Sequence, residues 1–211
     1  MIGLIIKDLF NLKKYMKQFG FSCFIFILLA VNLKSPNYFM GMGILLALMM
    51  SINAMAYDEN AHWDKYALTM PILRKDLVLS KYLLLLLSGV AGSLFTMVIA
   101  FILSVFLKLP ITIELLAINV SLFFVMLVFS SVILPLIFKL GIEKARLIMA
   151  AVAVIPTIVI LLIAKAVEKY NIPLPTESQL TIAAFAAPVV VLVIFFLSYN
   201  ISLSIVSKKE Y

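Results

Sequence analysis

Residues 57–82 read YDENAHWDKYALTMPILRKDLVLSKY, the longest polar interval in a chain that is otherwise mostly apolar. The interval holds four of the ten acidic residues, four of the seventeen basic residues, and the only histidine and tryptophan. Apolar runs lie on both sides of it, and each is long enough to cross a bilayer, which takes about 20 residues. This pattern predicts a membrane protein that presents the interval to the cytoplasm.

The composition of the whole chain supports a membrane location. Of its 211 residues 65% are hydrophobic and only 13% are charged, whereas soluble domains are about 45–50% apolar. The net charge of +7 is therefore explained by lysines at the membrane surface, and no nucleic-acid partner is expected. A single cysteine, Cys23, lies inside a predicted span and excludes a disulfide framework or a cysteine metal cluster.

The apolar runs predict an all-α polytopic fold of about six transmembrane helices within a single transmembrane domain, residues 1–211. Residues 1–18 are predicted to form an amphipathic helix in the membrane interface, since apolar and polar residues recur on separate faces. The alternative is that they only extend the first span into the cytoplasm. The predicted spans cover residues 19–33, 38–57, 82–107, 115–138, 147–164 and 180–206.

The distribution of basic residues predicts the orientation. With the N-terminus inside, thirteen of the seventeen basic residues fall in inner segments. The four in outer segments are Lys34, Lys108, Lys165 and Lys169. Because short cytoplasmic segments carry the excess of Lys and Arg, both termini and the 58–81 loop are predicted to be cytoplasmic.

The residues that several kinds of chemistry require are missing. No acid or base lies in the middle of a predicted span, which disfavours an ion-coupled transporter. The only imidazole, His62, has no partner histidine, so a metalloprotease or another intramembrane enzyme is disfavoured. No phosphate-binding G-x-x-x-x-G-K-[ST] motif is present. We therefore expect no catalytic, cofactor or metal site in this chain, and any ATP and Mg²⁺ to bind to a partner subunit.

The 58–81 interval is predicted to contain two short helices. The first would start at Asp58 and Glu59, because acids favour the positive end of a helix, and Pro71 would open the second. Aromatic and arginine side chains are typical anchors of protein interfaces, although Trp63 is equally well explained as a membrane anchor. The candidate docking residues are Asp58, Glu59, Trp63, Tyr66, Pro71, Arg74, Lys75 and Lys81.

The run D-E-x-x-x-W-x-x-Y-x-x-x-x-P-x-x-R-x-x-x-x-x-x-K-Y, residues 58–82, resembles the loop between the second and third spans of ABC-2 type transporter permeases. The short length, predicted inner N-terminus and basic amphipathic start also resemble that family. In overall form the chain is similar to the permeases of phenol-soluble-modulin exporters in Gram-positive bacteria. The resemblance implies a cytoplasmic ABC ATPase partner, a dimeric pore and a coupling helix in this loop. It also implies a location in the cell membrane of a bacterium.

These observations predict the permease subunit of an ATP-driven exporter for amphipathic or hydrophobic cargo such as a peptide, lipid or drug. The alternative is a non-transporting assembly or resistance protein that uses the 58–81 loop only to bind a partner. Two copies would supply two docking loops, so we expect a homodimer surrounded by membrane lipids. The small-residue pairs Ser88–Gly92 and Gly89–Ser93 would support close helix packing within or between copies.

Overall fold

The computed structural model describes residues 2–13, 15–67, 69, 73–110, 112–149, 154, 158, 161–162, 165, 169 and 176–209. The described chain is all-helical, as predicted. Residues 142–149 are also helical. The helices are α1 (Ile2–Lys13), α2 (Met16–Asn32), α3 (Pro36–Asn60), α4 (Trp63–Ala67), α5 (Arg74–Phe106), α6 (Ile113–Leu140) and α8 (Glu177–Lys208).

Four of these helices are long and apolar enough to span a membrane. They are α3, α5, α6 and the Phe185–Lys208 part of α8. Helices α1 and α2 together qualify as a fifth, although they are bent by 61°. The described chain therefore contains four or five candidate spans, which confirms a polytopic membrane protein. The predicted span over residues 147–164 lies outside the described residues.

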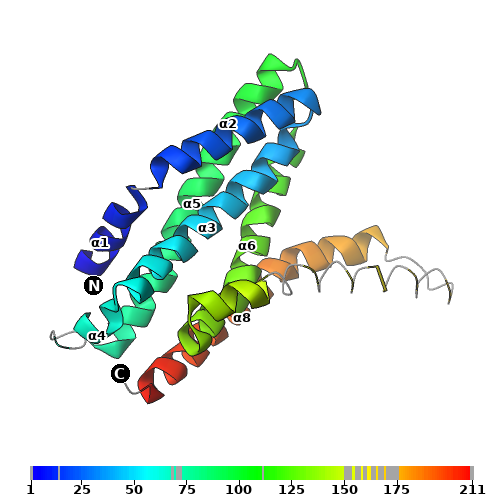
Figure 1. Cartoon of the computed structure of the whole chain (residues 1–211). Helices are drawn as coiled ribbons and strands as arrows, with labels where there is room; N and C mark the ends of the chain where they lie inside the picture. Colours follow the sequence, from blue (N-terminus) through cyan, green and yellow to red (C-terminus); the bar gives the residue numbers. More distant parts are fainter. Residues whose placement is uncertain are drawn as a thin grey trace.

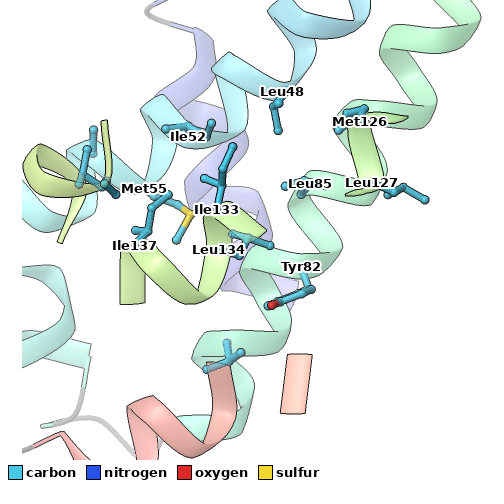
Figure 2. Packing of buried hydrophobic residues seen from close by; sticks show 14 of the residues in the cluster. Leu48, Ile52, Met55, Tyr82, Leu85, Met126, Leu127, Ile133, Leu134 and Ile137 are labelled. Atoms are coloured by element: carbon cyan, nitrogen blue, oxygen red, sulfur yellow. The ribbon is translucent and has the colours of Figure 1, made fainter. Parts of the chain in front are cut away.

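Helix α3 lies at the centre of the fold. It packs against α2, α5 and α6, while α6 pairs with α8, and Figure 1 shows α2, α3 and α5 running side by side. The main core joins Leu48 and Ile52 of α3 to Leu85 of α5 and Leu134 of α6, as Figure 2 shows. Because lipid tails are as apolar as these side chains, van der Waals packing holds such helices together.

Three small residues of α5, Ser88, Gly89 and Gly92, pack closely against neighbouring helices of the same chain. A Cβ added at Gly92 would lie 2.6 Å from Ala47 Cβ on α3, and one at Gly89 would lie 2.9 Å from Met126 Sδ on α6. Ser88 Oγ lies 2.5 Å from Ser51 Oγ of α3. These residues therefore bring α5 close to both α3 and α6.

Several polar side chains inside the bundle pair between helices. Asn119 of α6 donates a hydrogen bond from Nδ2 to Thr96 Oγ1 of α5 at 3.0 Å. The Tyr82 hydroxyl of α5 lies 2.7 Å from Ser198 Oγ and 2.9 Å from Ser202 Oγ of α8. Such contacts fix the register between helices, because an unpaired polar group in hydrocarbon is costly.

The structure corrects the N-terminal prediction. Residues 1–18 do not form one helix, since α1 ends at Lys13 and α2 begins at Met16. Lys7, on the predicted polar face, is partly buried and binds Asp58 of α3. Leu12, on the predicted apolar face, is buried with Ala54 of α3 and Leu84 of α5. Helix α1 therefore packs onto the bundle through the side that carries Leu4, Asp8 and Leu12, and its opposite side is exposed.

A second correction concerns Asp58 and Glu59. They do not start a short helix, because α3 continues without a break from Pro36 to Asn60 and includes both residues in its last turn. A carboxylate is unfavourable at the negative end of a helix, which is why the sequence favoured a helix start here. Lysines from α1 and α5 compensate Asp58 in the folded chain.

Candidate functional site

Those predicted docking residues that the structure describes lie at one end of the bundle. The start of α1, the end of α3, α4, the start of α5 and the end of α8 meet there (Figure 1). Within this end, α5 extends two turns beyond the predicted start of the third span at Tyr82, because it begins at Arg74. The polar interval is therefore mostly helical, and only a short connection around α4 separates α3 from α5.

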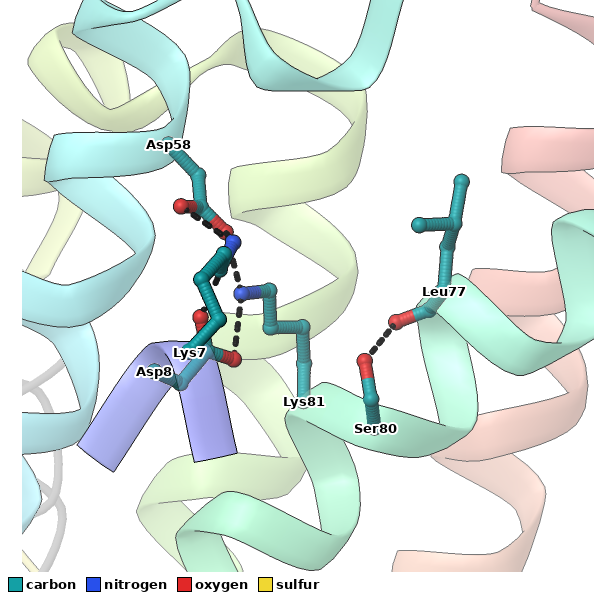
Figure 3. A network of polar contacts seen from close by, with 6 residues as sticks. All are labelled: Lys7, Asp8, Asp58, Leu77, Ser80 and Lys81. Atoms are coloured by element: carbon teal, nitrogen blue, oxygen red, sulfur yellow. Dashed lines mark hydrogen bonds and ion pairs between the residues drawn. The ribbon is translucent and has the colours of Figure 1, made fainter. Parts of the chain in front are cut away.

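A buried cluster of four charges joins three of these elements. Lys7 and Asp8 come from α1, Asp58 from α3 and Lys81 from α5 (Figure 3). Lys7 Nζ lies 2.6 Å from Asp58 Oδ1 and 3.1 Å from Asp8 Oδ1. Lys81 Nζ lies 2.7 Å from Asp8 Oδ2 and also donates a hydrogen bond to Asp58 Oδ2. We call these residues the charge cluster.

The charge cluster is balanced and shielded from water. Two ammonium groups face two carboxylates, and the Asp8 side chain is completely buried while those of Asp58 and Lys81 are almost so. Lys7 is the most exposed member, at 24% of its side chain. Among the described residues, Asp8 Oδ1 accepts no hydrogen bond, and its contact is the ion pair to Lys7. Removing one member would leave a buried charge without its partner, which is strongly unfavourable.

Trp63 connects α4 to the charge cluster. The Lys7 ammonium lies over its ring, 4.3 Å from the centroid, a cation–π contact. Beneath the ring, Leu4 of α1, Ala67 of α4 and Leu77 of α5 form a small buried cluster. Trp63 therefore ties α4 to α1. The exposed Tyr66 ring packs against it, with centroids 5.5 Å apart.

Glu59 bridges α3 to the segment that follows α6. Its Oε2 accepts a hydrogen bond from the Ile142 backbone N–H at 2.6 Å. Residues 142–149 are helical, so the carboxylate lies at the positive end of that helix. Gly141 has a φ of +80°, and a Cβ there would lie 2.5 Å from Glu59 Oε1. Only glycine fits this turn without strain.

Arg74 binds the end of the last helix. Its Nη1 donates to the Ser207 carbonyl oxygen at 2.5 Å and to the Val206 carbonyl oxygen at 3.4 Å. Carbonyls in the last turn of a helix lack partners within the helix and favour a cation. Arg74 therefore holds the start of α5 against the end of α8.

The structure divides the predicted docking residues into three groups. Those engaged within the chain are Asp58, Glu59, Trp63, Arg74 and Lys81. Tyr66 and Lys75 are exposed. Pro71 lies outside the described residues.

The sequence interpretation missed Asp8 as a member of the charge cluster and placed Lys7 only on a polar helix face. Both residues are adjacent in a helix that is otherwise rich in apolar side chains. The sequence did contain a signal. An acid–base pair lies near the N-terminus, and the 58–81 interval begins with an acid, Asp58, and ends with a lysine, Lys81. Sequence alone does not show that the two pairs meet.

The comparisons with known proteins agree with this architecture. The fold defines a polytopic, all-helical membrane protein. Residues 3–207 match the family described as ABC-2 family transporter protein, and the chain therefore belongs to that family. No curated protein and no solved structure was found to match.

Proposed function

We propose that this chain is the permease subunit of a bacterial ABC exporter, driven by a separate cytoplasmic ATPase that binds ATP and Mg²⁺. Family membership over residues 3–207 supports the transporter role and implies the ATPase. The proposed cargo is amphipathic or hydrophobic: a peptide, a lipid or a drug. The cargo would pass along apolar helices. In the described part of the chain, the charged residues of these helices lie toward the helix ends.

The observation that carries the proposal is the junction of α1, α3, α4 and α5. The charge cluster and Trp63 bind α4 to both α1 and α5, so force applied to α4 passes directly to the start of a spanning helix. Exposed Tyr66 and Lys75 leave a surface beside this junction for a partner. In this scheme, closure of the ATPases on ATP moves α4, and the charge cluster transmits the movement to α5 and α3.

The orientation is tested by thiol labelling. In a Cys23→Ala background, cysteines placed at the exposed positions Asn37 and Thr176 are expected to react with an impermeant reagent in intact cells. A cysteine at exposed Asn60, beside the charge cluster, is expected to stay unlabelled until the cells are opened. Labelling of Asn60 in intact cells would reverse the orientation and remove α4 from the ATPase side.

The assembly is tested by the mass of the solubilised complex. Two ATPases each need a docking segment, and one chain supplies one α4. Closed two-fold pairing is the commonest oligomer, so we expect native mass spectrometry to find two permeases with two ATPases. A different second permease would exclude the homodimer. A chain that copurifies with no ATPase would favour the alternative, a non-transporting assembly or resistance protein.

A further inference from the structure

An apolar groove lies at the bend between α1 and α2. It has a volume of about 650 Å³ and is bounded by α1, α2, α3 and α5. It follows α5 from Leu87 to Phe95, a rise of about 12 Å at 1.5 Å per residue. A volume of this size falls within the range of about 300–1,000 Å³ typical of ligand sites.

The interior of the groove offers apolar contact and almost no hydrogen bonding. Leu9, Met16, Leu87 and Phe95 are substantially exposed along it. Ser88 provides the one hydroxyl among the described lining residues. Its Oγ already pairs with Ser51 Oγ and donates to the Leu85 carbonyl oxygen at 3.0 Å. An occupant must therefore be a hydrocarbon along this length.

Among the described residues that line the groove, Lys13 carries a positive charge. Lys13, in the last turn of α1, is exposed and makes no ion pair with any residue in the described part of the chain. It differs in this from Lys7, whose charge the cluster neutralises. Lys13 lies six residues further along α1, about 9 Å at the helical rise. The charge of Lys13 thus lies at the bend between α1 and α2, and the described lining is uncharged from there toward Phe19 and Phe95.

We propose that this groove binds one acyl chain of an anionic phospholipid, whose phosphate pairs with the Lys13 ammonium. The hydrocarbon fills the space between α1 and α5, and the headgroup stays beside the bend, where a basic helix end attracts anionic lipid. By filling this space, the lipid stabilises the angle between α1 and α2. This site involves neither the ATPase nor the cargo, so its test does not depend on the proposed function.

The test is lipid binding to the purified chain by native mass spectrometry, with phosphatidylglycerol and phosphatidylcholine of identical acyl chains. We expect phosphatidylglycerol to bind more tightly, and Lys13→Gln to weaken its binding about fivefold and abolish the preference. Ala91→Phe fills the groove and is expected to weaken binding of both lipids at least about tenfold. Lys17→Gln, an exposed cation outside the lining, and Ala117→Phe, an exposed alanine on α6, are the matched controls and should change neither.

Three outcomes would overturn the proposal. Equal binding of the two lipids would mean that any hydrocarbon fills the groove without recognition of the phosphate. Equal effects of Lys13→Gln and Lys17→Gln would mean that general surface charge attracts the lipid. If Ala91→Phe leaves lipid binding intact but changes the oligomeric state, the groove is covered by a second copy of this chain. Circular dichroism of each variant confirms that it is folded.

Discussion

Asp8→Asn is expected to lower the free energy of unfolding by about 3–5 kcal/mol, the range for breaking a buried ion pair by removing one partner. Asp8 is fully buried and accepts a hydrogen bond from Lys81 at 2.7 Å. Without its charge, two lysines would face only Asp58. The variant therefore leaves an excess positive charge in a site that water does not reach.

The measurement is unfolding of the detergent-solubilised chain by sodium dodecyl sulfate, with circular dichroism as the readout. Lys81→Met alone should also be destabilising, while Asp8→Asn combined with Lys81→Met should lose much less than the sum, because Lys7 and Asp58 remain a balanced pair. Glu114→Gln is the control, since Glu114 is exposed on α6 and should change stability by less than about 0.5 kcal/mol. Strict additivity of the two losses would show that the cluster is not coupled.

Tyr66→Ala is expected to weaken binding of the ATPase by about 2 kcal/mol, roughly thirtyfold, as for an interface residue that carries much of the binding energy. Tyr66 is 57% exposed and belongs to α4, so its loss should leave the fold intact. The readouts are copurification of the ATPase and stimulation of its activity by cargo. Both should fall while the unfolding of the permease stays unchanged.

Tyr38→Ala provides the matched control. Tyr38 is 56% exposed and lies in the first turn of α3, at the opposite end from α4. It should affect neither readout. If Tyr66→Ala retains full copurification and full stimulation, α4 is not the coupling element, and the Trp63–Tyr66 pair is then better explained as a membrane anchor.

The structure also shows why other docking candidates give less decisive tests. Arg74→Ala would release the end of α8, and Trp63→Ala would remove the contact of α4 with Lys7. Either change disturbs the fold as well as any partner surface. Exposed Lys75 is the better companion to Tyr66, because it has no described role in holding the helices together.

The sequence by itself determined the class of protein. Runs of about 20 apolar residues must satisfy their backbone hydrogen bonds internally in a bilayer, so they become spanning helices wherever they occur. This is why the sequence predicted a polytopic, all-helical membrane protein, which the structure confirms. The motif in residues 58–82 also led to the family that residues 3–207 match.

Only the tertiary structure decided what the polar residues do. Helix α3 ends at Asn60 and not before Asp58, and α5 starts at Arg74 and not near Pro71. Both boundaries depend on partners far away in the chain. Asp58 is tolerated in the last turn of α3 because Lys7, 51 residues earlier, and Lys81, 23 residues later, lie against it. Periodicity reports which face of a helix is apolar, whereas the pairing of buried charges depends on how helices are placed in three dimensions.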